Sequence, residues 1–382
     1  MISKLLALSL MVFFLGGGPG RVEGRQASPR RVVDEVIRPL MEKDGIPGMA
    51  VGLIVDGRSL VLNYGVASLK TRRPVDHDTI FEIGSCSKTL TATLAQWAQA
   101  KGYMHLSDQV GEHMASLAGS RFGGVTLIEL GTHTPGGLPL QVPENIHDDR
   151  ELLHYLEAWE PKFKPGSYRT YTNIGIGMLG LLVAKNRNEA FSILMRNQVL
   201  LPLGMRDTFY TVPKRRMADY AQGYTRHDRP IRLAPGELWA EAYGVKTTAR
   251  DMLRFLAANM GEAGLGTTLG RAVVATHTGY FQAGAMVQDL IWEQYSYPVS
   301  LKALLQGNSP DMAFNATPVA RITPPSPPRE DVWINKTGST NGFGAYIAFV
   351  PGEHLGIVML ANKNYAIADR VAAAYAILSR LR

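Results

Sequence analysis

Two hairpin signals, one near each end of the chain, constrain the fold more than any other feature of the sequence. Near the start, apolar runs at residues 49–55 and 59–64 flank an Asp-Gly dipeptide, which is favoured in tight turns between antiparallel strands. Near the end, runs at residues 345–350 and 355–360 flank a Pro-Gly turn. We therefore predict one antiparallel sheet that is built from both ends of the chain.

Apolar residues recur with helical spacing in two segments outside the hairpins, residues 31–43 and 372–381, which predicts a helix in each. Residues 86–200 read mostly as helix and loop, and residues 205–240 and 280–330 read as long loops. The second of these contains the run Ile-Thr-Pro-Pro-Ser-Pro-Pro, which cannot be a central strand. The fold class expected is α/β plus α: an antiparallel sheet flanked by helices, with a mostly helical second lobe.

The first 24 residues are typical of a secretory signal. A lysine precedes an apolar run at residues 5–15, and glycines and a proline then break any helix. A buried N-terminal helix is the alternative. We expect residues 1–24 to be removed on export to the periplasm. The rest of the chain should form an α/β lobe from residues 25–99 and 200–382 and a helical lobe from residues 100–199.

Composition excludes several classes of protein. A chain of 382 residues with one cysteine has no intramolecular disulfide and no cysteine-rich zinc site. The net charge is +7, but the basic residues form no blocks, which argues against a nucleic-acid partner. No later run is long enough to span a membrane, so we expect no anchor after the signal is cleaved. A monomer is expected, because no amphipathic helix suited to dimerisation stands out.

A Ser-x-x-Lys sequence at Ser85 and Lys88 leads into a run with helical apolar spacing. Residues three apart share a helical face, so the Lys88 amine can lie beside the Ser85 hydroxyl. A serine needs such a base to become a nucleophile, and free N–H groups at a helix N-terminus can bind a developing oxyanion. Taken alone, the motif is better explained as an N-cap serine with a surface lysine.

Two further short motifs follow in the sequence. Tyr171-Thr172-Asn173 precedes a helix-like run, and alone it is uninformative. Lys336, Thr337 and Gly338 end a run of bulky apolar residues that is typical of a strand. A glycine there would let a ligand approach the strand closely, although a strand end followed by a turn is the simpler interpretation.

The three motifs in this order match the set known for penicillin-recognising serine enzymes. With tyrosine in the middle motif, the chain resembles the class C β-lactamases, the AmpC-type cephalosporinases. The resemblance covers nearly all of the mature chain. It includes the segments at 136–143, 240–246, 336–350 and 356–365.

The resemblance implies a role for each matching residue and implies no metal and no cofactor. Ser85 would be the acylated nucleophile, with Lys88 and Tyr171 moving its proton, and which of the two acts first stays open. Lys88 and Lys336 would stabilise the tyrosine anion, since a phenol otherwise ionises near pH ~10. The substrate contacts implied are Gln141 and Asn173 for an amide, Lys336 and Thr337 for a carboxylate, Ser339 with Ser85 for the oxyanion, Tyr243 as an aromatic wall, and Asn364 and Arg370 as a second carboxylate-side cluster.

The sequence departs from the family at two positions. His133 stands where the family commonly has tyrosine, and Ile367 where it often has asparagine. The second change puts carboxylate contacts on that side in doubt, and we expect both changes to tune substrate preference. Cys86 lies within the nucleophile motif, and we expect a small buried residue rather than a reactive thiol.

Three other patterns are interpreted structurally. The G-x-G-x-x-G at residues 175–180 has no acid about twenty residues further on, as a dinucleotide-binding motif requires, so we expect glycines that let a helix pack closely behind Tyr171. His147-Asp148-Asp149 lacks metal-binding spacing. Asn315-Ala316-Thr317 is a formal glycosylation acceptor with no meaning in a bacterial periplasm.

The function expected is hydrolysis of the β-lactam amide of cephalosporins and penicillins through a serine acyl-enzyme, which confers resistance. The substrate would be the only partner. Two alternatives remain: a DD-peptidase or esterase on the same fold, and a binding or sensor protein that is acylated without turnover.

Overall fold

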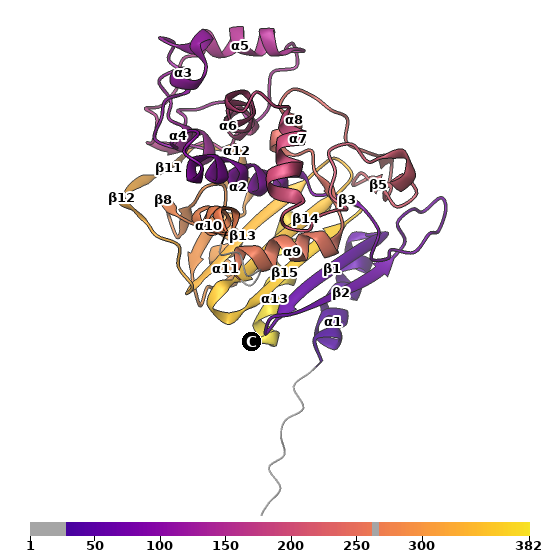
Figure 1. The fold of residues 1–382 in the computed structure, drawn as a ribbon. Coiled ribbons are helices and arrows are strands. Elements are labelled where there is room, and N and C mark those ends of the chain that lie inside the picture. The colour runs from indigo at the N-terminus through magenta and orange to yellow at the C-terminus, as the bar shows by residue number, and fades with distance from the viewer. Residues whose placement is uncertain (1–27, 262–266) are drawn as a thin grey trace, which may run out of the picture.

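The computed structural model describes residues 28–261 and 267–382, so the predicted signal segment lies outside the described residues. A nine-stranded antiparallel sheet forms the centre of the molecule (Figure 1). Its strands, in spatial order, are β12 (Ala320–Ser326), β8 (Gly279–Ala283), β9 (Met286–Gln288), β10 (Glu293–Ser296), β13 (Val332–Ser339), β14 (Gly344–Val350), β15 (Leu355–Ala361), β1 (Gly48–Val55) and β2 (Arg58–Gly65).

Both predicted hairpins are confirmed, and they join the two ends of the chain. β1 pairs with β2 on one side and with β15 on the other. Asp56 and Gly57 have φ of 49° and 71°, the left-handed geometry that a two-residue turn between twisted strands requires. One antiparallel sheet therefore contains the first and the last strands of the protein.

Alternating side chains of the central strands fill two hydrophobic cores, one on each face of the sheet. Met49 and Val51 of β1 pack in a core with α1 (Pro29–Asp44) and α13 (Ile367–Leu381). Ala50 and Ile54, on the opposite face, belong to the core shared with the remaining helices. Because both faces are covered, every residue of β14 and β15 is buried.

Most of the other helices lie against the second face or together above it (Figure 1), whereas α11 (Leu301–Gly307) packs beside α13 in the core of the first face and Met312 packs against that core. These other helices are α2 (Ser87–Ala100), α3 (Val110–His113), α4 (Leu127–Gly131), α5 (Asp149–Glu157), α6 (Asn173–Asn186), α7 (Phe191–Met195), α8 (Trp239–Ala242), α9 (Ala249–Asn259), α10 (Thr268–Ala275), α11 and α12 (Pro310–Phe314). One core joins the helices of the second face to the sheet, and the proposed boundaries of the two lobes stay a prediction.

The prediction of a long loop at residues 280–330 is wrong. This segment holds β9, β10, β12, α11 and α12, and most of β8. Its strands are short and separated by turns, so hydrophobic periodicity has too few residues to reveal them. The proline-rich run is confirmed as peripheral, because β12 is an edge strand with a shifted register against β8. The C-terminal helix also begins earlier than predicted, at Ile367.

Short strand pairs complete the structure. They are β3 (Phe81–Glu82) with β7 (Lys246–Thr247), β4 (Tyr168–Arg169) with β11 (Thr317–Pro318), and β5 (Gly223–Tyr224) with β6 (Pro230–Ile231). Because β4 immediately precedes Tyr171 and β11 lies near α12, the second pair links the two sides of the pocket described below. Among the described residues, no helix is long and apolar enough to cross a membrane.

Candidate active site

Ser85 lies in a short 3₁₀ turn, Gly84–Cys86, that leads directly into α2. The end of β13 packs against this turn at very close range. A Cβ on Gly338 would lie 2.0 Å from the carbonyl oxygen of Ile83, and one on Gly84 would lie 2.4 Å from that of Ser339. Only glycine fits at these two positions, so the backbones of Ser85 and Ser339 are held side by side.

Lys88 occupies the same face of the helix as Ser85, one turn later. Its Nζ donates to Ser85 Oγ at 2.9 Å and to the carbonyl oxygen of Ala242 at 2.9 Å. The side chain is fully buried, so the alternative of a surface lysine is wrong. Burial disfavours the cation and lowers the pKa of Lys88 to about 8, which makes the neutral amine available as a base.

Tyr171 lies between β4 and α6, and the amines of two lysines lie close to its ring. The Nζ of Lys88 is 5.2 Å and that of Lys336 is 5.1 Å from the ring centroid. Burial alone would raise the pKa of Tyr171, but Lys336, then Lys88, and a hydrogen bond with Ser85 lower it to about 8. The phenol is therefore far more acidic than an ordinary tyrosine, as the motif predicts.

Lys336, on β13, is buried beside the same tyrosine. Its Nζ donates to the carbonyl oxygen of Thr337 at 3.1 Å. Burial would lower the pKa of Lys336, but the charges of Tyr171 and Glu293 outweigh it and raise that pKa. Lys336 therefore stays protonated at a pH at which Lys88 can lose its proton, so Lys336 can act as a fixed positive charge and Lys88 as a base.

The two amides expected to hold the substrate are in contact. Asn173 is the first residue of α6, and its Nδ2 donates to Gln141 Oε1 at 2.8 Å. Asn173 Oδ1 is buried and has no partner among the described residues. A buried carbonyl oxygen without a donor favours a ligand N–H at this place.

A cavity of about 610 Å³ brings the predicted residues together. Lys88 and Arg370 lie behind its wall. The other predicted residues line it, and they are Ser85, Gln141, Tyr171, Asn173, Tyr243, Lys336, Thr337, Ser339 and Asn364. Ile367 also lines the cavity, so an apolar side chain replaces a polar one there.

Arg370 is fully buried and supports the end of β13 from behind. Its Nη1 donates to the carbonyl oxygen of Gly338 at 2.6 Å and to Ser339 Oγ at 2.9 Å, and its Nη2 donates to Asn364 Oδ1 at 3.0 Å. These contacts point the guanidinium towards the strand rather than towards the cavity. A direct contact between Arg370 and substrate stays a prediction.

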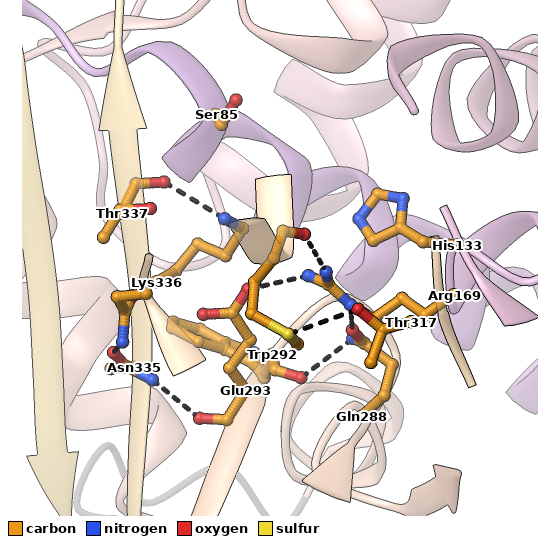
Figure 2. A network of polar contacts seen from close by, with 12 residues as sticks. Ser85, His133, Arg169, Gln288, Trp292, Glu293, Thr317, Asn335, Lys336 and Thr337 are labelled. Carbon is orange, nitrogen blue, oxygen red and sulfur yellow. Dashed lines mark hydrogen bonds and ion pairs between the residues drawn. The ribbon is translucent and has the colours of Figure 1, made fainter. Parts of the chain in front are cut away.

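Sequence reasoning missed a buried polar network (Figure 2), of which Arg169, Glu293 and Met312 line the cavity. Arg169 donates to Gln288 Oε1 at 2.7 Å, to the carbonyl oxygen of Met312 at 2.6 Å and to Glu293 Oε1 at 3.0 Å. The Arg169 guanidinium also lies 5.6 Å from the ring centroid of Tyr171. Three of these partners fall within the segment predicted as a loop, and the only local signal was an arginine two residues before Tyr171.

The remaining sequence patterns have structural roles. The glycines of the G-x-G-x-x-G lie within α6, and a Cβ on Gly177 or Gly180 would come within 3.0 Å of side chains of the neighbouring segment 238–241, so close packing is confirmed. Asp148 is the N-cap of α5. Cys86 is buried, its Sγ lies 3.5 Å from the Lys336 carbonyl oxygen, and burial raises its pKa to about 12, which leaves an unreactive thiol.

Comparison with known proteins agrees with this geometry. The beta-lactamase family profile matches residues 33–382. A beta-lactamase of Pseudomonas fluorescens is 46% identical over 92% of this chain and 98% of its own. Among solved structures, the D-alanine carboxypeptidase AmpC of Burkholderia cenocepacia is 53% identical with a TM-score of 0.88, covering 92% of this chain and 98% of that one. A class C beta-lactamase in complex with cefoxitin is 48% identical with a TM-score of 0.90, covering 93% and 99%. The chain belongs to the beta-lactamase family, in its class C branch.

Proposed function

We propose that the protein hydrolyses the amide bond of β-lactams through an acyl-enzyme on Ser85. The observation that carries this proposal is the 2.9 Å contact from Lys88 Nζ to Ser85 Oγ, where Ser85 lines a cavity that Tyr171 also lines and both Lys88 and Lys336 lie close to the Tyr171 ring. A serine with a buried, readily deprotonated partner is an activated nucleophile. Cephalosporins and penicillins are the expected substrates, and resistance to them is the expected consequence.

In the acylation step, Ser85 Oγ attacks the lactam carbonyl carbon and loses its proton to Lys88 or Tyr171. The backbone N–H groups of Ser85 and Ser339 stabilise the oxyanion that forms. The C–N bond then breaks, and the ring nitrogen takes up a proton from the same Lys88–Tyr171 pair. In the second step the pair removes a proton from water, which attacks the ester; the bond from the carbonyl carbon to Ser85 Oγ then breaks, and Oγ takes that proton back from the pair.

Substrate orientation falls to the residues around this centre. Gln141 and Asn173 bind the side-chain amide of the substrate, Lys336 and Thr337 bind its carboxylate, and Tyr243 forms the aromatic wall. Asn364 and Arg370 act on the carboxylate side, Arg370 through Ser339. With Ile367 in the cavity wall, the carboxylate depends more heavily on Lys336 and Thr337.

The similarity to the D-alanine carboxypeptidase of Burkholderia cenocepacia favours a second candidate, a DD-peptidase. Acylation chemistry is common to both functions, and they differ in how fast water attacks the acyl-enzyme.

Turnover of nitrocefin by the purified protein tests the first function, with Ser85→Ala as the control. Loss of turnover in the control together with rapid recovery of free enzyme, measured by mass spectrometry after penicillin, supports the β-lactamase. A long-lived adduct on Ser85 with release of D-alanine from a D-Ala-D-Ala peptide supports the peptidase. A stable adduct with neither activity would indicate a sensor.

We also propose that the protein is a periplasmic monomer, exported by the segment 1–24 and needing no metal or cofactor. The signal-like sequence of that segment supports export. Sequencing of the N-terminus of the secreted protein tests the cleavage, and light scattering during gel filtration tests the monomer.

A further inference from the structure

His133 contacts three successive residues centred on Tyr171. Its carbonyl oxygen accepts from the N–H of Thr170 at 2.8 Å, and its ring Nδ1 accepts from the N–H of Thr172 at 3.3 Å. Between these two contacts, its ring faces that of Tyr171 with centroids 4.4 Å apart and planes inclined by 40°. One residue therefore holds the backbone on both sides of the tyrosine, through its own backbone carbonyl at Thr170 and through its imidazole at Thr172, and the imidazole also packs on the tyrosine ring.

The backbone of His133 is in the left-handed region, with φ of 59°. A residue other than glycine adopts this conformation at a cost, which surrounding contacts must offset. Here the left-handed turn lets the carbonyl and the ring of one residue reach amides two residues apart. Thr172 in turn is the N-cap of α6, so the contact reaches the start of the helix that carries Asn173.

The contacts of His133 define its protonation state. Because Nδ1 accepts an N–H, the ring proton of the neutral imidazole is on Nε2, which is buried and has no partner among the described residues. Burial holds the pKa of His133 well below its usual range, and the nearby cations Arg169, Lys88 and Lys336 lower it further.

The other charged groups around the tyrosine agree with a neutral ring. Arg169 forms an ion pair with Glu293, and Lys88 and Lys336 lie close to the tyrosine ring. A protonated His133 would point an N–H at the N–H of Thr172 and add another positive charge next to the tyrosine.

We propose that His133 is a positioning residue for Tyr171, which it orients through a neutral imidazole with Nδ1 as a fixed acceptor. This inference rests on the proposed function, because Tyr171 is the residue through which it acts. Simple filling of space by an aromatic ring would account for the ring contact but not for the hydrogen bond that Nδ1 accepts from the N–H of Thr172. The acceptor atom is therefore the feature to test.

Two substitutions separate the acceptor from the ring. His133→Asn keeps an oxygen acceptor near the position of Nδ1, and asparagine tolerates the left-handed backbone. His133→Phe keeps the aromatic packing but has no acceptor. We expect His133→Asn to keep kcat for nitrocefin within about threefold of the wild-type value. We expect His133→Phe to lower kcat at least about tenfold with little change in KM, because displacing a catalytic group lowers the reaction rate and leaves substrate binding largely unchanged.

The pH profile and the tautomer provide readouts that packing alone would not change. We expect the ionisation seen in kcat/KM to shift in His133→Phe and to stay in place in His133→Asn. Equal loss in both variants, or full activity in His133→Phe, would overturn the proposal. If His133→Phe does not fold, ¹⁵N NMR of the wild-type imidazole decides: an Nε2–H tautomer that persists down to pH about 5 supports the proposal, and any other state contradicts it. An inactive wild type with that tautomer would instead refute the proposed function.

Discussion

Arg169 and Glu293 form a buried ion pair, with Nη2 and Oε1 3.0 Å apart, in the wall of the cavity that Ser85 also lines. Their side chains are 2% and 6% exposed, so solvent screens the pair very little. The arginine also holds Gln288 and the carbonyl oxygen of Met312. The pair therefore joins the strand before Tyr171 to the sheet and to α12.

Removing one member of this pair should destabilise the protein strongly. In Glu293→Ala the guanidinium loses its counter-charge but stays buried, so we expect the free energy of unfolding to fall by about 3–5 kcal/mol. Urea denaturation followed by circular dichroism measures this change. The exposed pair Arg329–Asp331 offers a matched control, and Asp331→Ala should hardly move the midpoint. A similar small effect of Glu293→Ala would contradict this account of the buried pair.

The ion pair also illustrates what the sequence could not predict. Its members are 124 residues apart, and Glu293 lies among short strands that have no clear periodicity. The hairpin at residues 56–57 and the contact between Ser85 and Lys88 depend on neighbours along the chain, so local rules predict both. The fold was therefore predictable at its two ends, and the catalytic motif was predictable within one helix, whereas the polar network in the cavity wall depended on long-range pairing.

A methyl group at Gly338 should separate the strand from the nucleophile. Its Cβ would lie 2.0 Å from the carbonyl oxygen of Ile83 and 2.9 Å from the backbone nitrogen of Cys86, so β13 must move. Because displacement by about 1 Å can cost roughly 10²-fold in rate, we expect Gly338→Ala to lose about that factor in kcat. Gly124→Ala is the control, since its Cβ would meet nothing closer than 3.6 Å. Steady-state kinetics of the two variants on nitrocefin make the comparison, and equal rates would contradict the predicted clash.

Cys86 should be unreactive in the folded protein although it is adjacent to Ser85. Its side chain is fully buried, and burial raises its pKa to about 12, so almost no thiolate exists at neutral pH. We expect DTNB to label no thiol in the native state and, since the chain has a single cysteine, one per chain in denaturant. Labelling of the native protein at the rate of a free cysteine would show that this site opens.

The pH dependence of catalysis should report the Lys88–Tyr171 pair. Burial lowers the pKa of Lys88 to about 8, and Lys336 and Lys88 outweigh burial to bring the pKa of Tyr171 to about 8. The reaction needs this pair to have lost one proton, so kcat/KM should rise with pH through an apparent pKa that belongs to the pair.

Lys336→Ala tests the origin of that apparent pKa. It removes the largest charge that lowers the pKa of Tyr171, so that pKa should rise and the ascending limb of kcat/KM should move to higher pH by about one unit or more. Weaker carboxylate binding will also lower kcat/KM at every pH, which is why the position of the limb, and not its height, is the measurement. Lys302→Ala, which removes an exposed lysine, should leave the limb in place. A limb that stays fixed in Lys336→Ala would mean that Lys336 binds the substrate without acidifying the tyrosine, and the proton transfer would then have to depend on Lys88 alone.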